Sequence, residues 1–154
     1  MAPREIAIGD IQPLAGQELG VSPWHSVTQG EINAFADATH DHQWIHVDVE
    51  RAKRESPFGG PIAHGYYTLS IIPYLMEQVW TITGASSALN YGLNKLRFPA
   101  PVSIGAQVRL RVVLNTVENI PGGIQVNVTL KVEVEGVEKP ACVAEGLYRF
   151  YTAT

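Results

Sequence analysis

The chain has 154 residues, of which 45% are hydrophobic and 17% charged, a composition that fits one globular domain with a buried core. Its formal net charge of −4 argues against a nucleic-acid partner, because binding to phosphates requires a clustered basic surface. Cys142 is the single cysteine, so no intrachain disulfide can form and a reducing compartment is expected.

Neither a leader peptide nor a membrane span is expected. The N-terminal stretch MAPREIAIGDIQPLAG has no apolar core of signal-peptide length. The longest apolar-rich stretch, residues 66–82, contains a proline and several polar residues, and is too polar for a helix that crosses a bilayer. We therefore expect a single domain over residues 1–154, located in the cytoplasm, with no membrane partner.

The first half of the chain predicts short elements joined by polar loops. Residues 21–27 are typical of an extended segment, and residues 28–39 predict a helix that begins with the capping box Thr28-x-x-Glu31. Residues 39–48, THDHQWIHVD, follow as a loop. Asp48 is placed to cap a second helix over residues 49–55, and the prolines and glycines of residues 56–65 indicate another loop.

The second half predicts one long helix followed by a sheet. Residues 63–84 are apolar nearly all the way round, which indicates a helix buried on most sides, with a kink or break at Pro73 and Gly84 at its end. Alternating apolar residues then predict strands over the stretches 88–98, 107–119, 124–136 and 139–153. An antiparallel sheet wrapped around one buried helix is an α+β architecture, and its uncovered edge favours a dimer.

The stretch 39–48 raises three chemical alternatives, because it holds three of the chain's five histidines. His40, His42 and His46 are candidate zinc ligands, although residues two apart on an extended chain point to opposite sides. Histidines in a polar loop are more often ordinary solvated residues or bonded to the backbone. In the third alternative, Asp41 and His46 form an acid–base pair that shares one water at the edge of the core.

A second segment, PIAHGYY, offers a different group. The step from His64 to Gly65 opens the predicted long helix, where backbone N–H groups are unpaired and favour negative charge. Gly65 has no side chain to block a ligand oxygen from its N–H. An N–H that polarises a thioester carbonyl, together with an acid–base pair, suits addition of water at the neighbouring carbons. No nucleophile motif of the G-x-S-x-G kind and no phosphate-binding loop occurs in the sequence.

The stretch from FADATHDHQWIHVD through PFGGPIAHGYYTLSIIPYL resembles the hydratase motif of the MaoC-like dehydratases, the (R)-specific enoyl-CoA hydratases, and is most similar to their NodN-like branch. The later NYGLNKLRFPAPVSIGAQVRL is similar to the downstream strand segment of that branch. The resemblance implies a hot-dog fold, usually a homodimer, and reversible hydration of a trans-2-enoyl-CoA to an (R)-3-hydroxyacyl-CoA. It also implies no metal and no organic cofactor.

Carried over by position, the resemblance implies that Asp41 and His46 are catalytic and that the Gly65 N–H binds the enolate oxygen. Two positions depart from the family pattern: His40 replaces a glycine, and Gln43-Trp44 replaces Asn-Pro, as in the NodN-like branch. A non-glycine at the first position costs about 1 kcal/mol if its φ is positive.

Substrate contacts are expected from Gln43 and His64 near the acid–base pair. Lys95 and Arg97, or Arg109 and Arg111, are candidates for the phosphates of the CoA substrate, although alternating charges on a strand are also typical of its solvated face.

Two other functions remain open from the sequence. The first is a hot-dog acyl-CoA thioesterase, which would place a carboxylate on the central helix, and Glu77 is the candidate. The second is a non-catalytic module that binds acyl thioesters. The histidine at position 40, in place of the family's glycine, supports this alternative. The acyl-chain length is not readable from the sequence.

Overall fold

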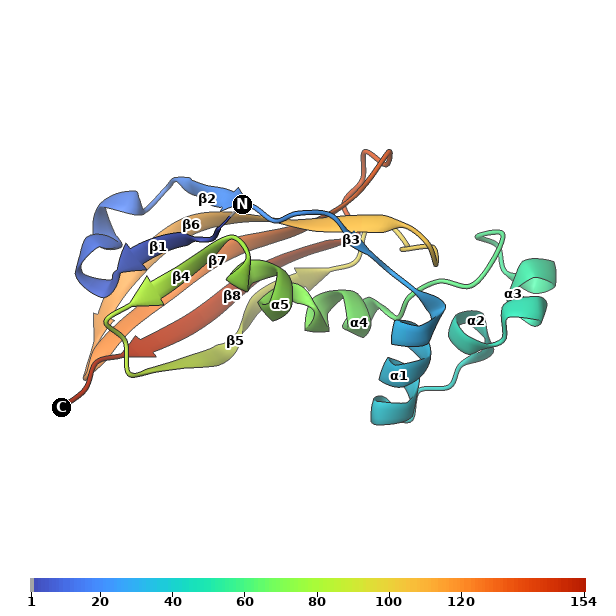
Figure 1. Cartoon of the computed structure of the whole chain (residues 1–154), viewed down its shortest axis with the longest axis horizontal. Coiled ribbons are helices and arrows are strands. Elements are labelled where there is room, and N and C mark those ends of the chain that lie inside the picture. Colours follow the sequence, from blue (N-terminus) through green and yellow to red (C-terminus); the bar gives the residue numbers. More distant parts are fainter. Residues whose placement is uncertain (1) are drawn as a thin grey trace.

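The computed structural model describes residues 2–154 and contains one large curved antiparallel sheet with helices against its concave face (Figure 1). The strands of this sheet lie in the order β2-β6-β7-β8-β5, and the short β3 also pairs with β6. Their bounds are β2 Glu18–Val21, β3 His25–Ser26, β5 Ser87–Arg97, β6 Gln107–Ile120, β7 Gly123–Val134 and β8 Cys142–Tyr151.

Alternation in the sequence explains why one face of this sheet forms the core. In β7 every second residue is buried, and Val126, Val128 and Val132 have no exposed surface. Pairing continues this apolar face across the sheet, since Leu110 of β6 lies opposite Val132, and Val132 lies opposite Cys142 of β8. The predicted antiparallel meander of three long strands is confirmed. The other long strand, β5, joins at the β8 edge.

The helix predicted from the capping box is confirmed as α1, Gln29–Thr39. Thr28 accepts a hydrogen bond from the Glu31 N–H, and the Glu31 carboxylate accepts one from the Thr28 N–H. The helix α3, Val49–Glu55, is also confirmed, and its cap is Asp48, which accepts from the Arg51 N–H at 3.0 Å. The intervening stretch is not wholly a loop as predicted, because a single helical turn, α2 (Trp44–Val47), lies within it.

The prediction of one long helix over residues 63–84 was wrong after Glu77. Two short helices, α4 (Gly65–Ser70) and α5 (Ile72–Glu77), meet at Ile71, close to the break that the sequence predicted at Pro73. The helical part of the stretch therefore ends at Glu77, well before Gly84.

The end of the same stretch is a strand. Residues Trp80–Thr83 form β4, which pairs in parallel with β1, Arg4–Ala7. The aromatic and β-branched residues of β4 favour a strand once a partner strand is available. Two short 3-10 turns, η1 (Ile8–Asp10) and η2 (Gln12–Leu14), connect β1 toward the main sheet.

The central helices are also less covered in the single chain than predicted. Tyr67, Ile72 and Leu75 are buried against the sheet, whereas 67% of Tyr66 and 55% of Tyr74 is exposed. Figure 1 shows α4 and α5 lying along the concave face between the sheet and solvent, with α1, α2 and α3 grouped beyond the start of α4. No helix among residues 2–154 is long and apolar enough to cross a bilayer.

Candidate active site

Asp41 occupies the turn that leaves α1. The helix ends at His40, which adopts the left-handed conformation with φ 62°. The positive φ that the sequence raised as a possibility is therefore present, and it turns the chain so that Asp41 faces back toward α2. Asp41 is exposed, and one of its carboxylate oxygens accepts a long contact of 3.4 Å from the Gln43 N–H.

His46 lies on α2 and is held by its ring and its backbone. Its Nδ1–H donates to the Ile62 carbonyl at 2.7 Å, so Nε2 is left as the free basic nitrogen. Its own carbonyl accepts from the Gln29 side chain at 2.8 Å, which ties α2 to the start of α1. The residue is 8% exposed. Burial lowers the pKa of His46 below the ordinary 6.5; neighbouring His64 adds to this, while the Ile62 bond and the Asp41 carboxylate oppose it.

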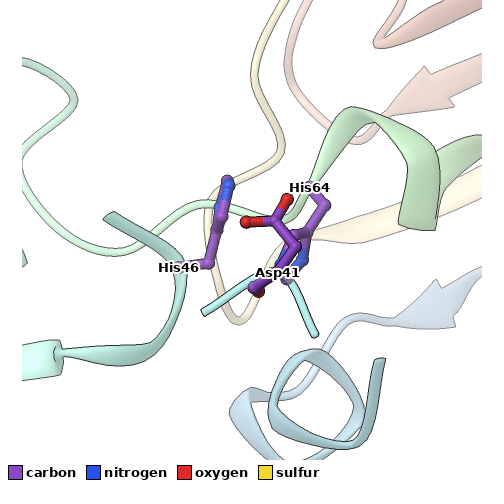
Figure 2. A group of neighbouring side chains, drawn as sticks. All are labelled: Asp41, His46 and His64. Carbon is purple, nitrogen blue, oxygen red and sulfur yellow. The ribbon is translucent and has the colours of Figure 1, made fainter. Parts of the chain in front are cut away.

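His64 completes the cluster from a third segment. It is the residue before α4, it is 2% exposed, and its Nε2–H donates to the Asp41 carbonyl at 3.0 Å. Its ring stacks on His46 with centroids 3.9 Å apart and planes inclined by 27°. Figure 2 shows the Asp41 side chain directed toward the same small region as the two rings. One ligand-type atom from each of Asp41, His46 and His64 lies within 4.8 Å of the others.

The zinc alternative drawn from His40, His42 and His46 does not match this arrangement. His42 bonds to Asp37 at 2.9 Å, and His40 ends α1. Within residues 2–154, the one group with suitable atoms close together is Asp41 with His46 and His64. The rings of its two histidines are stacked, with planes inclined by 27°.

Gly65 begins α4 immediately after His64, and its N–H donates to no backbone carbonyl within residues 2–154. The Phe98 ring covers it so closely that a Cβ at Gly65 would lie 2.9 Å from a ring carbon. A cavity of about 400 Å³ adjoins this point; its walls include Phe58, Ile62, Ala63, Gly65, Phe98 and Val102. The absence of a side chain at Gly65 therefore lets the Phe98 ring lie against the backbone at this point.

The remaining predicted substrate contacts are not among the three clustered side chains. Gln43 is exposed just before α2. Lys95 and Arg97 are exposed on β5, and the Arg97 guanidinium donates to the carbonyl of its neighbour Leu96. Arg109 and Arg111 both bind Glu133, and Arg111 also binds Glu18, so ion pairs on the sheet surface engage both side chains.

Several contacts that build the site were missed from the sequence. They are the Gln29 amide, the Ile62 carbonyl and the Phe98 ring, which act on His46 or Gly65 across 16 to 33 residues of chain. A backbone carbonyl has no residue signature, so only the fold reveals the Ile62 bond. The aromatic Phe98 close to two prolines was a visible signal, but nothing local relates it to Gly65.

Comparison with known proteins identifies one family and two similar relatives. Residues 10–136 match the family described as MaoC like domain. The chain is 52% identical over 145 residues to 3-hydroxyacyl-thioester dehydratase Z of Mycobacterium tuberculosis (strain ATCC 25618 / H37Rv), which covers 94% of this chain and 95% of that protein. It is 44% identical over 144 residues to nodulation protein N of Rhizobium meliloti (strain 1021), which covers 91% of this chain and 88% of that protein.

The fold also resembles a solved structure, the (R)-hydratase from A. caviae involved in PHA biosynthesis. The TM-score is 0.71 at 22% identity, with 87% of this chain and 94% of that chain covered. At this identity the likeness speaks for the fold alone, and it confirms the hot-dog arrangement of a sheet around central helices.

Proposed function

Because this chain belongs to the MaoC-like dehydratase family, a family of hydro-lyases, we propose that it adds water reversibly to trans-2-enoyl-CoA and forms (R)-3-hydroxyacyl-CoA. The observation that carries the proposal is the convergence of Asp41 and His46 with His64, whose neighbour Gly65 has an N–H with no backbone acceptor among residues 2–154. These groups supply a water site and an oxyanion site, which are the two things that the reaction requires.

The acid–base pair acts on water. The Asp41 carboxylate and the His46 Nε2 each accept one hydrogen bond from the same water, whose oxygen adds to C3 of the enoyl group. The proton that this water releases passes to the pair, and the pair delivers a proton to C2. The lowered pKa of His46 favours the neutral ring that can accept it. Two groups that share one water exchange its proton, so the proton is assigned to the pair.

The Gly65 N–H acts on the thioester. As water adds to C3, electrons move onto the thioester oxygen and form an enolate, and a donor aimed at that oxygen stabilises it. Gly65 carries no side chain that would push the Phe98 ring and crowd the oxygen at this N–H. We propose that the reaction needs no metal and no organic cofactor, since water activation and enolate binding are both assigned to this chain's own groups.

Two adjoining cavities are proposed for the acyl chain. They have volumes of about 380 and 510 Å³ and lie between the central helices and strands β5 and β8, sharing Pro73, Asn90 and Tyr148 in their walls. The larger one begins at Leu69 and Ser70, about one turn of helix beyond Gly65. The walls of the smaller cavity are largely apolar and suit a hydrocarbon chain that runs away from the thioester along the helix.

A second copy of the chain is proposed as the partner that covers this face. Strand β5 is exposed along nearly its whole length, and 52% of Leu89, 54% of Tyr91 and 40% of Leu93 is open to solvent. Exposed apolar residues on a strand at the sheet edge favour association. Tyr66 and Tyr74 on the helices add to the same uncovered apolar surface.

The thioesterase alternative receives no support from the geometry. Glu77 is the last residue of α5, and Gly65 is the first residue of α4. The two residues therefore stand at opposite ends of the central helices, about 18 Å apart along an ideal helix axis. A thioester carbonyl bound at the Gly65 N–H would lie far from the Glu77 carboxylate.

The test is hydration of crotonyl-CoA, followed by the loss of the conjugated enoyl absorbance, with the product offered to an (R)-specific and to an (S)-specific 3-hydroxyacyl-CoA dehydrogenase. We expect hydration by the wild type and oxidation by the (R)-specific enzyme alone. Asp41→Asn and His46→Gln should each lower kcat by about 10²-fold or more. The matched control is His42→Gln, because His42 is an exposed neighbour in the same loop.

Three results would contradict the proposal. Full activity in folded Asp41→Asn or His46→Gln would show that Asp41 and His46 are not the acid–base pair. Release of free thiol from acyl-CoA without hydration would show a thioesterase, and tight binding of enoyl-CoA without turnover would show a binding module. Running the same assay with the enoyl group on acyl carrier protein and on CoA chains of several lengths, compared as kcat/KM, identifies the preferred thioester and chain length.

A further inference from the structure

His64 is a buried polar residue that the proposed chemistry does not use. It is 2% exposed, and it contacts both members of the acid–base pair. We propose that His64 is a positioning residue that sets the placement of Asp41 relative to His46, an inference that rests on the proposed hydratase function. It does so through a hydrogen bond on one side and a ring stack on the other.

The hydrogen bond holds Asp41. A carbonyl oxygen only accepts, so the Nε2 of His64 carries the hydrogen that bonds to the Asp41 carbonyl at 3.0 Å. The other hydrogen bonds of Asp41 are longer: its N–H reaches Thr39 Oγ1 at 3.5 Å, and its carboxylate meets the Gln43 N–H at 3.4 Å. Among the described residues, the bond from His64 is therefore the best one that Asp41 makes.

The ring stack holds His46. The bond from Nδ1 to the Ile62 carbonyl fixes the direction of the His46 ring within its own plane. Movement out of that plane is limited by the His64 ring, whose centroid is 3.9 Å away. The His64 ring also contacts Phe35 of α1, with centroids 4.9 Å apart, so it is itself held by packing.

The backbone of His64 links this arrangement to Gly65. The His64 carbonyl accepts from the N–H groups of Tyr67 and Thr68 at 3.1 and 3.2 Å, which forms the first turn of α4. The residue that begins the helix with its backbone thus orients Asp41 with its side chain. Any movement of His64 changes the water site and the oxyanion site together.

The unpaired Nδ1 of His64 indicates that the ring does more than fill space. The Nδ1 of His64 is buried and has no hydrogen-bond partner among the described residues. A buried acceptor left unpaired is unfavourable, and a phenyl ring would fill the same space without it. What phenylalanine lacks is the donor to Asp41.

Three substitutions separate the donor from the ring. His64→Phe keeps a planar ring and removes the donor. His64→Gln removes the ring and keeps an amide donor near the position of Nε2, whereas the amide of His64→Asn is too short to reach it. The matched controls are His42→Phe and His42→Gln in the neighbouring loop, where the side chain is half exposed.

In the hydration assay, His64→Phe should lower kcat by about tenfold to hundredfold with a much smaller change in KM, because displacing a reacting group by about 1 Å has this effect. His64→Gln should recover part of the lost kcat, and His64→Asn should not. A second readout needs no substrate: NMR titration of the His46 ring, which is faced by Asp41, His64 and the Ile62 carbonyl. The pKa of His46 should rise in His64→Phe, because the neighbouring imidazole contributes to its lowering.

The proposal is overturned if folded His64→Phe keeps the kcat of the wild type, if its loss lies in KM alone, or if the His46 titration is unchanged. If His64→Phe does not fold, equal kcat in His64→Gln and His64→Asn overturns it instead. If the wild type hydrates no enoyl thioester, the proposed function is wrong. The NMR titration needs no substrate, so it still shows whether His64 acts on His46.

Discussion

His46 donates its Nδ1–H to the Ile62 carbonyl across 2.7 Å, and this bond leaves Nε2 as the nitrogen available to a water beside Asp41. The tautomer of the proposed base is thus set by a backbone group 16 residues along the chain. Burial of the same ring lowers its pKa below 6.5, and this shift makes the stability of the protein depend on pH near that value.

The first prediction concerns pH. Folded His46 binds protons more weakly than unfolded His46, so the free energy of unfolding decreases as the pH falls from about 6.5 toward the lowered pKa. Above 6.5 this contribution is fully present. Urea unfolding at a series of pH values should show the decrease in the wild type and a smaller one in His46→Gln. The apparent pKa at which kcat/KM falls on the acid side of its pH profile should lie below 6.5. An apparent pKa above 6.5 would contradict the assignment of His46 as the base.

The second prediction concerns Gly65. In Gly65→Ala the new Cβ would lie 2.9 Å from a carbon of Phe98, an exposed ring that can move. Alanine keeps the N–H, but the new Cβ and the displaced ring crowd the oxygen proposed to bind there. We therefore expect kcat to fall by about 10²-fold, as when one oxyanion contact is lost, with little change in stability. The matched control is Gly60→Ala, where nothing lies within 4 Å of the new Cβ. Wild-type kcat in Gly65→Ala would show that the reaction does not require a residue without a side chain at this position.

The third prediction concerns the end of α1. His40 has φ 62°, a conformation that glycine adopts without strain. His40→Gly should therefore raise the free energy of unfolding by about 0.5–1 kcal/mol, measured by urea denaturation. His42→Gly, two residues on and outside the left-handed region, should lower it. A loss of stability in His40→Gly would show that the imidazole makes a contact that outweighs the backbone strain.

The fourth prediction concerns association. If a second copy covers β5, the wild type should show twice the mass of one chain by light scattering coupled to size exclusion. Leu93→Lys places a charge on the exposed apolar strand and should shift the protein toward monomer. Val137→Lys is the control, since Val137 is also exposed but lies outside β5. A monomeric wild type at all concentrations would contradict the proposed dimer.

Local signals predicted the parts of the fold that depend on neighbours in sequence. The capping box of Thr28 and Glu31 located α1, and alternation located β6 and β7. The stretch Trp80–Thr83 was misassigned because its apolar residues fit a helix as well as a strand. Only pairing with β1, near the start of the chain, decides between them.

The candidate site shows the same division between local and distant information. Asp41, His46 and Gly65 were proposed through a resemblance in a motif of neighbouring segments, and the fold brings these segments together. The contact from His64 to the Asp41 carbonyl depends on backbone atoms and on the turn at His40. Backbone atoms and a turn at a non-glycine residue leave no recognisable pattern in the sequence. The sequence therefore predicted His64 as a substrate contact and gave no sign of its bond to Asp41.

The proposed chemical groups all lie within residues 41–65, whereas the cavities proposed for the acyl chain are lined by residues 69–93, 130 and 148–150. Under the proposed function, reaction and substrate choice are carried by different stretches of the polypeptide. Substitutions that reshape the cavity walls can accumulate without disturbing proton transfer. A protein built in this way can change the length or branching of the chain it accepts in small evolutionary steps, with its catalysis intact throughout.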